Sequence, residues 1–133
     1  MGVDVGTVRV GIALSDASAT VATPHSTLPA GEDLVPALAA LAAELSCETV
    51  VLGLPKGMSG RDTASTRHAR EVGAKLSEQG LNVQLWDERL SSVEAERVLI
   101  QVGRRREERR VERDRIAAAI ILQGWLDAHG VRA

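Results

Sequence analysis

Alternating apolar and polar positions at the start of the chain predict three strands. In the second of them Val10, Ile12 and Leu14 occupy every other position, which places them on one face. The third contains Pro24, and proline favours an edge strand because it has no backbone N–H to donate to a neighbour. The predicted strands cover residues 3–5, 9–14 and 20–28, joined first by a turn at Gly6 and Thr7.

A period of three to four residues follows and predicts helices that alternate with two further strands. Gly80 closes the second of these helices. A short buried strand covers residues 49–52, and the last strand covers residues 82–86. The apolar faces of the two helices are Leu34, Leu38, Leu41 and Leu45 in the first, and Ala69, Val72 and Leu76 in the second.

The last part of the chain predicts two more helices. Ser91 and Glu94 have the spacing of a capping box, so a helix is expected to begin there. An arginine-rich connection covers residues 103–113, and a nearly all-apolar, buried helix runs from Asp114 to Trp125. Three strands followed by alternating helices and strands predict one α/β domain over residues 1–133. Its sheet is mixed and five-stranded, with three antiparallel strands and then two parallel ones, flanked by helices.

The composition is that of an ordinary globular domain, with 44% apolar and 26% charged residues. No apolar run is long enough to cross a membrane. Cys47 is the only cysteine, which excludes an intrachain disulfide and a cysteine zinc site. With no N-terminal targeting segment, it favours the cytoplasm. The chain has neither Phe nor Tyr, so contacts with a nucleic acid are expected to involve phosphates rather than stacked bases.

Three acidic residues occupy places that a surface charge would not choose. Asp4 lies in the first strand among β-branched residues, Glu88 follows the last strand, and Asp114 begins the buried helix. An ionised carboxylate in such surroundings is costly without a compensating charge. Carboxyl ends of strands gather at one edge of an α/β sheet, and clustered carboxylates suit two Mg²⁺ or Mn²⁺ ions that hydrolyse a phosphodiester.

Each acid also has a simpler interpretation. In isolation, Asp4 reads as a strand acid hydrogen-bonded to a turn. Asp87 competes with Glu88, because neighbours on a strand point to opposite faces and both preceding residues are apolar. Asp114 is also a suitable helix N-cap. The arginines of residues 104–115 are interspersed with four acids, so a solvated helix end and a phosphate-binding segment are equally supported.

Four blocks of sequence resemble the YqgF/RuvX family, whose members are described as Holliday junction resolvases and as nucleases of pre-16S ribosomal RNA. Residues 2–16 match G-x-D-x-G…R-x-G-x-A-x-S-D, and residues 51–55 with Gly60 resemble the family's central strand and loop. Residues 87–95 resemble D-E-R-L-S-T-x-E-A, and residues 114–123 resemble D-x-I-A-A-x-I-L-Q. The blocks keep the family's order and span nearly the whole chain.

The resemblance implies an RNase H-like fold and a nuclease that depends on Mg²⁺ or Mn²⁺. It assigns Asp4, Glu88 and Asp114 as the catalytic and metal-binding acids. One departure concerns Arg113, which stands before the third acid where the family tends to be apolar. The residues implied in binding substrate are Gly6, Thr7, Arg9, Lys56, Arg61, Arg89, Arg104 and Arg105.

Four functions are compatible with these features. The first is a nuclease acting on RNA, in 5′-end processing of pre-16S rRNA during ribosome biogenesis. The second is a DNA nuclease at four-way junctions in recombination and repair, which would need a homodimer to cut two strands. The third is a non-catalytic RNA-binding regulator, which the acid triad disfavours. The fourth is an ATP-binding domain of the actin/sugar-kinase type, whose phosphate loop resembles residues 4–7 but which needs two such domains.

Overall fold

The computed structural model describes residues 1–56, 59–90 and 106–129, with side chains from Asp114 onward in the last helix. Seven of the elements precede residue 88 and follow the order expected from the sequence. A short 3₁₀ helix, η1, comes directly after the last strand and begins with Glu88, one of the three acids that the sequence analysis singled out. The elements are β1 (Gly2–Val5), β2 (Arg9–Ser15), β3 (Ala22–Pro29), α1 (Leu34–Glu44), β4 (Thr49–Leu54), α2 (Ala64–Glu78), β5 (Asn82–Asp87), η1 (Glu88–Leu90) and α4 (Arg106–His129).

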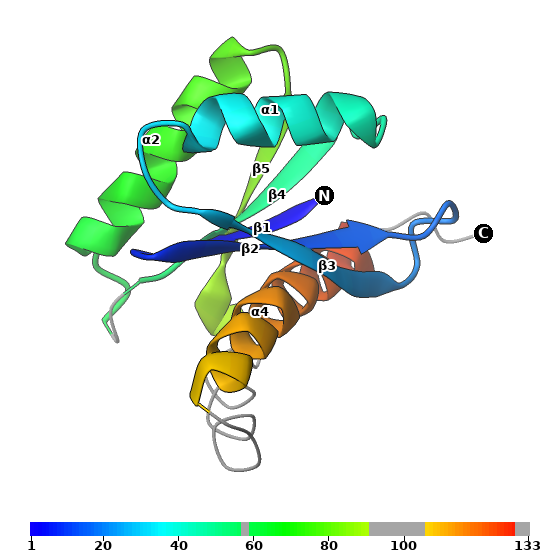
Figure 1. The fold of residues 1–133 in the computed structure, drawn as a ribbon. Coiled ribbons are helices and arrows are strands. Elements are labelled where there is room, and N and C mark those ends of the chain that lie inside the picture. Colours follow the sequence, from blue (N-terminus) through cyan, green and yellow to red (C-terminus); the bar gives the residue numbers. More distant parts are fainter. Residues whose placement is uncertain (57–58, 91–105, 130–133) are drawn as a thin grey trace.

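The strands form one mixed sheet in the order β3-β2-β1-β4-β5 (Figure 1). Strand β2 is antiparallel to both β1 and β3, whereas β4 is parallel to both β1 and β5. The expected fold class, with three antiparallel strands followed by two parallel ones, is therefore confirmed. Strand β3 lies at an edge of the sheet, as Pro24 indicated. Pro24 pairs with Ala13 of β2, and the register between β2 and β3 shifts between Ile12 and Ala13.

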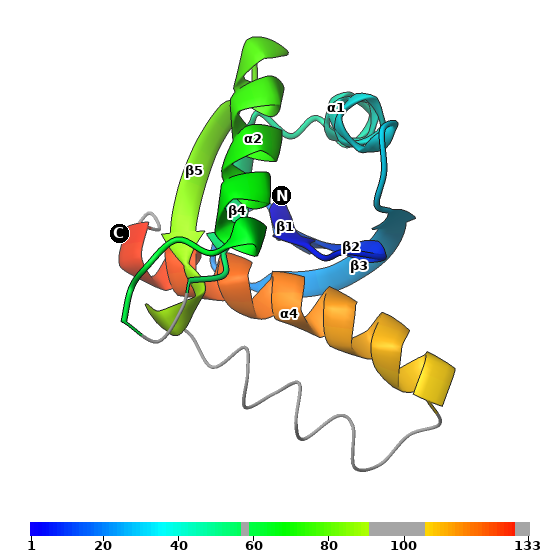
Figure 2. The ribbon, with the colours of Figure 1, turned by 90° about the vertical axis from the view of Figure 1, so that its left-hand side faces the viewer.

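Helices cover both faces of the sheet. Helices α1 and α2 lie on one face and α4 crosses the other (Figures 1 and 2). Strand alternation fills the α1/α2 side with large apolar side chains, including Val3, Ile12 and Leu52. On the α4 side, Ala13 and Val51 of the sheet pack against Ile121 and Leu122 of the helix, and Trp86 packs against the same cluster. No helix in the described ranges is long and apolar enough to cross a membrane.

Helix α2 begins beside the carboxyl end of β4 because of two threonines. The Thr63 side chain accepts a hydrogen bond from the backbone N–H of Thr66, and the Thr66 hydroxyl accepts one from the backbone N–H of Thr63. Thr66 is fully buried, and its hydroxyl also donates to the carbonyl of Pro55. This reciprocal cap fixes the first turn of α2 next to the end of β4.

Helix α4 begins at Arg106, eight residues before the start expected at Asp114. The expectation that residues 103–113 form a connection is therefore wrong from Arg106 onward, and Asp114 is not an N-cap. The prediction relied on an apolar face, which this stretch lacks, whereas Arg and Glu are themselves good helix formers. The helix expected from Ser91 lies outside the described residues.

Candidate active site

Asp4 points towards α4 because of its position in β1. Val3 is buried in the core under α1 and α2, so the next residue faces the opposite side of the sheet. Only 5% of Asp4 is exposed. Its partner across the antiparallel ladder is Gly11 of β2. A buried carboxylate therefore stands in the middle of the sheet face that α4 covers.

Gly11 allows α4 to bring Asp114 close to this carboxylate. A Cβ atom added at Gly11 would lie 1.9 Å from the backbone oxygen of Asp114 and 2.5 Å from its carbonyl carbon. No residue with a side chain fits there, because both atoms belong to the backbone of α4. The helix consequently rests directly on β2, on the strand next to Asp4.

Gly53 makes the corresponding space on the other side of Asp4. The parallel register pairs Val3 with Leu52, so Gly53 lies beside Asp4 one residue further along. A Cβ atom at Gly53 would lie 3.1 Å from Oε1 of Glu88 and 2.5 Å from Cδ1 of Ile121. Glu88 is 9% exposed. Two glycines flanking Asp4 thus leave room for two acids from distant parts of the chain.

The three acids line one cavity of about 500 Å³ at the carboxyl end of β1. The turn between β1 and β2 forms one wall, and the end of β4 with the first turn of α2 forms another. The lining residues are Asp4, Val5, Gly6, Thr7, Val8, Arg9, Pro55, Ser65, Glu88 and Asp114.

Arg9 carries positive charge into this cavity. Its Nε atom donates to Oδ2 of Asp114 at 3.0 Å, across 105 residues of sequence. The two side chains are 26% and 16% exposed, so water screens the pair less than it would a surface pair. Arg9 therefore holds the carboxylate of Asp114 in this conformation.

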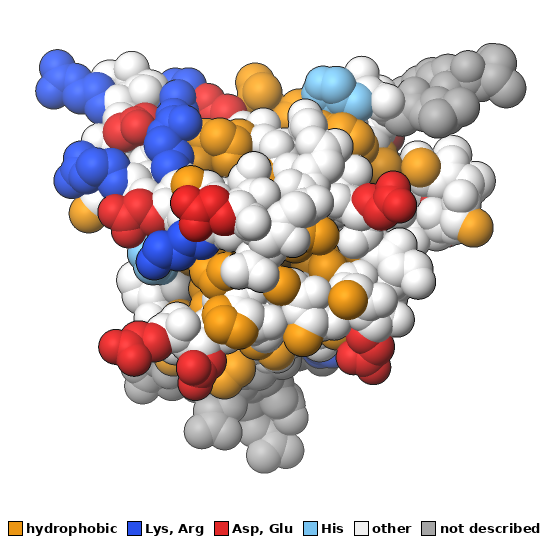
Figure 3. All heavy atoms as spheres, turned by 90° about the horizontal axis from the view of Figure 1, so that it is seen from above, with side chains coloured by type: hydrophobic (Ala, Val, Ile, Leu, Met, Phe, Trp, Pro, Cys, Tyr) orange, Lys and Arg blue, Asp and Glu red, His pale blue; other side chains and the backbone are white. Residues whose placement is uncertain are grey.

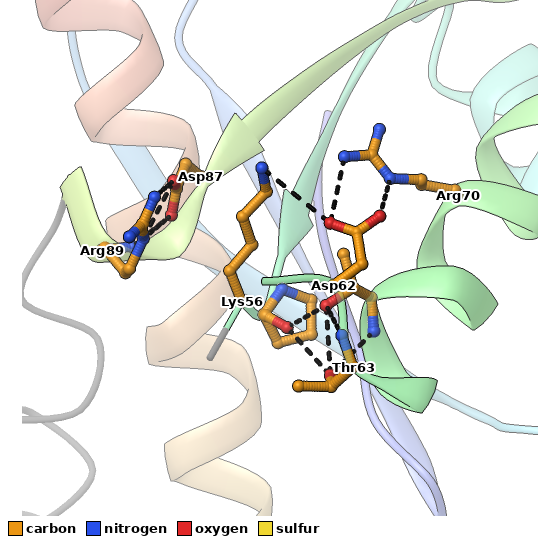
Figure 4. Close-up of polar contacts among 8 residues, drawn as sticks. Lys56, Asp62, Thr63, Arg70, Asp87 and Arg89 are labelled. Carbon is orange, nitrogen blue, oxygen red and sulfur yellow. Dashed lines mark hydrogen bonds and ion pairs between the residues drawn. The ribbon is translucent and has the colours of Figure 1, made fainter. Parts of the chain in front are cut away.

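Asp87 and Glu88 have separate roles. The carboxylate of Asp87 accepts hydrogen bonds from the backbone N–H and the guanidinium of Arg89, including one of 2.6 Å from Nη2 (Figure 4). These hydrogen bonds, first of all those from the guanidinium, hold the pKa of Asp87 below its usual value. Asp87 thus stabilises the turn at η1 and is not among the residues that line the cavity, whereas Glu88 is.

A second charged cluster stands beside this turn. Asp62 pairs with Nε of Arg70 at 2.9 Å and with Nζ of Lys56 at 3.9 Å (Figure 4). The hydrogen bond from Arg70 lowers the pKa of Asp62. A Cβ atom at Gly60 would lie 3.1 Å from Nη1 of Arg89, so the loop before α2 also touches the Asp87–Arg89 pair.

The structure brings together some of the predicted site residues and not others. Asp4, Glu88 and Asp114 share the cavity with Gly6, Thr7 and Arg9. Lys56, Arg61 and Arg89 do not line it, and the first and last of these are held by Asp62 and Asp87. Arg104 and Arg105 lie outside the described residues.

Ser65 and Val8 line the cavity, although the sequence analysis did not single them out. A capping signal was present for Ser65, because Thr63 and Thr66 have helix-start spacing directly after the loop. Nothing marked Val8, which is 68% exposed in the β1–β2 turn.

The chemistry of the lining is that of oxygen donors with one cation. Among the described residues, no three His, Cys, Asp or Glu side chains stand close enough together to hold a metal ion as a set. The residues that line the cavity nevertheless include three acids, a threonine, a serine and an arginine. Such a set suits a hard divalent cation and a phosphate rather than zinc or a soft metal.

Comparisons with known proteins identify the family of this chain. A protein from Lactococcus lactis subsp. cremoris (strain MG1363) named "Putative pre-16S rRNA nuclease" is 43% identical, with 99% of this chain and 96% of that protein covered. Proteins of the same name from Myxococcus xanthus and Mycobacterium tuberculosis are 42% and 43% identical, over 97% and 96% of this chain and 87% and 77% of their own. A family model described as "RuvX: Holliday junction resolvase" matches residues 1–128. The chain therefore belongs to the RuvX family.

Proposed function

We propose that this protein is a metal-dependent nuclease that hydrolyses phosphodiester bonds in RNA, with the 5′ end of pre-16S rRNA as its substrate during ribosome biogenesis. The observation that carries the proposal is the convergence of Asp4, Glu88 and Asp114 on one cavity. Relatives over 40% identical that are named for pre-16S rRNA favour RNA as the substrate. The cytoplasm, where such a precursor would be processed, is the proposed location.

The three carboxylates are the proposed ligands of two Mg²⁺ or Mn²⁺ ions. Hard oxygen donors in a shared cavity fit these cations. A bound cation would also help to offset the cost of burying the carboxylates of Asp4 and Glu88. Bound metal ions would activate the attacking water and stabilise the leaving oxygen. The protein fixes the backbone positions of two of these acids, because Asp4 belongs to a central strand and Asp114 to a helix resting on Gly11.

The remaining lining residues are the proposed phosphate contacts. Arg9, Thr7 and Ser65 all line the cavity. The exposed face over α1 and α2 carries Lys and Arg side chains on one side, with Asp and Glu among them (Figure 3). Because its charges are mixed, this face does not form a continuous basic surface for nucleic acid. Binding is therefore expected to depend on the cavity and its rim, with little base readout.

Variants of the three acids test the proposal. Asp4→Asn, Glu88→Gln and Asp114→Asn should each lower metal-dependent cleavage by at least about 100-fold, or ~2.7 kcal/mol of barrier. Each should retain the fold, since removing one of several clustered charges relieves repulsion. Asp33→Asn is the matched control, because Asp33 is exposed and its side chain makes no capping hydrogen bond to α1.

The substrates should be end-labelled single-stranded RNA, single-stranded DNA and a four-way junction, each with Mg²⁺ or Mn²⁺. Cleavage of RNA that is lost in the acid variants and kept in Asp33→Asn would support the proposal. The name of the matching family model favours a second function, and paired symmetric cuts in the junction would identify a dimeric resolvase. If no substrate is cut with either metal, the nuclease proposal is wrong and a non-catalytic RNA-binding role is favoured.

A further inference from the structure

The ion pair between Arg9 and Asp114 joins a phosphate-binding candidate to a metal-binding candidate. Arg9 lies two residues before Gly11 on the same face of β2, so its side chain points to the side of the sheet that α4 covers. From there it reaches Oδ2 of Asp114 at 3.0 Å. The pair is better shielded than that of Arg70 and Asp62, whose side chains are 41% and 37% exposed.

This pairing opposes the binding of a cation at Asp114. A guanidinium in hydrogen-bond contact neutralises the charge that would attract a divalent ion, and the two cations also repel one another. Arg9 is nevertheless a quarter exposed and lines the same cavity, so a phosphate entering the cavity meets its guanidinium. A guanidinium group binds the oxygens of a phosphate as readily as it binds the oxygens of a carboxylate, because its planar N–H donors match both.

We propose that Arg9 is a positioning residue that acts as an exchangeable counter-ion. It holds Asp114 while the cavity is free of nucleic acid, and it transfers to a non-bridging phosphate oxygen when a strand enters. That transfer withdraws the positive charge of Arg9 from Asp114 and so favours a divalent cation there, which couples substrate binding to metal binding. The inference rests on the proposed metal-dependent nuclease function, and it concerns the regulation of that same site.

Removing the charge of Arg9 should change two affinities in opposite directions. Without nucleic acid, Arg9→Gln should bind Mn²⁺ about three- to tenfold more tightly than the wild type, measured from the free Mn²⁺ signal in electron paramagnetic resonance. In EDTA, where no cleavage occurs, the same variant should bind single-stranded RNA more weakly. The slope of log affinity for RNA against log salt concentration should become shallower by about one, which is the contribution of one phosphate contact. A purely structural role would weaken both.

Three further variants make the test specific. Arg9→Lys keeps the charge and should bind Mn²⁺ like the wild type. Arg9→Met keeps the aliphatic stem and replaces Arg9→Gln if that variant unfolds. Arg70→Gln removes the more exposed pair with Asp62, which lies outside the cavity, and should leave Mn²⁺ affinity unchanged.

The outcomes separate this inference from the proposed function. If the wild type binds no Mn²⁺ with or without RNA, the metal-dependent function itself is wrong. If the wild type binds Mn²⁺ and Arg9→Gln binds it equally or more weakly, the counter-ion role is overturned while the nuclease proposal stands. If Arg9→Gln binds Mn²⁺ more tightly but RNA unchanged, the transfer of Arg9 to phosphate is overturned.

Discussion

Replacing Gly11 with alanine tests how the third acid is positioned. The new methyl group would lie 1.9 Å from the backbone oxygen of Asp114, where an ordinary contact begins near 3.4 Å. The backbones of α4 and β2 must therefore move apart by about 1.5 Å at this point. No change of rotamer relieves the clash, because every nearby atom belongs to the backbone of Asp114 or Arg115.

Two effects of different size should follow. Overpacking of this kind typically costs about 1–3 kcal/mol, partly offset by the gain of about 0.4–1 kcal/mol when alanine stiffens the unfolded chain. The expected loss of stability is about 1–2 kcal/mol, or a decrease in Tm of about 3–10 °C for a chain of this size. Activity should fall by about 100-fold or more, since a displacement of about 1 Å in a reacting group costs that much.

Thermal unfolding followed by circular dichroism gives the first quantity, and cleavage at a temperature where both proteins are folded gives the second. Gly73→Ala is the matched control. Its new methyl group would lie 3.1 Å from a side-chain atom of Leu52 rather than against backbone. Alanine also has a higher helix propensity than glycine. Gly73→Ala should lower Tm by less than Gly11→Ala does and leave activity intact. A Gly11→Ala protein with wild-type Tm and full activity would refute the placement of α4 on β2.

Two other substitutions test the supports around the cavity. Thr66→Val keeps the shape of a fully buried side chain but removes the hydrogen bonds that its hydroxyl makes with the carbonyl of Pro55 and the N–H of Thr63. The carbonyl of Pro55 then keeps the longer hydrogen bond of 3.4 Å from the Thr63 hydroxyl. Thr66→Val should lower the free energy of unfolding by about 1–3 kcal/mol in urea titrations, and an unchanged midpoint would contradict the capping role. At Asp16, hydrogen bonds from the backbone N–H groups of Thr20 and Val21 hold the carboxyl pKa below its usual range. A carboxyl group whose pKa is lower in the folded than in the unfolded chain stabilises the fold at pH values above its unfolded pKa of about 3.9. This stabilisation is lost as the pH falls towards the folded pKa. The Tm advantage of wild type over Asp16→Asn should therefore narrow from about pH 5 to pH 2, and a constant difference would show that the charge of Asp16 is not involved.

The sequence predicted the fold well where a periodic apolar pattern exists. Strand alternation identified β1 and β2, and Pro24 correctly indicated an edge. The start of α4 was missed because seven of the eight residues 106–113 are Arg or Glu, and a search for an apolar face does not detect such a helix. Length and propensity would have been the better signals there.

By itself the sequence determined the chemistry available to this protein: three acids in costly places, a glycine-rich turn and arginines near both. The tertiary structure decided which of these groups meet. Gly11 and Gly53 flank Asp4 only because β1 lies between β2 and β4, and that arrangement admits Asp114 and Glu88 to its two sides. It also separated Glu88 from Asp87, since a turn held by Arg89 directs one into the cavity and the other away. The physical reason is that contacts between residues up to 105 positions apart depend on strand order and close packing, which local patterns do not encode.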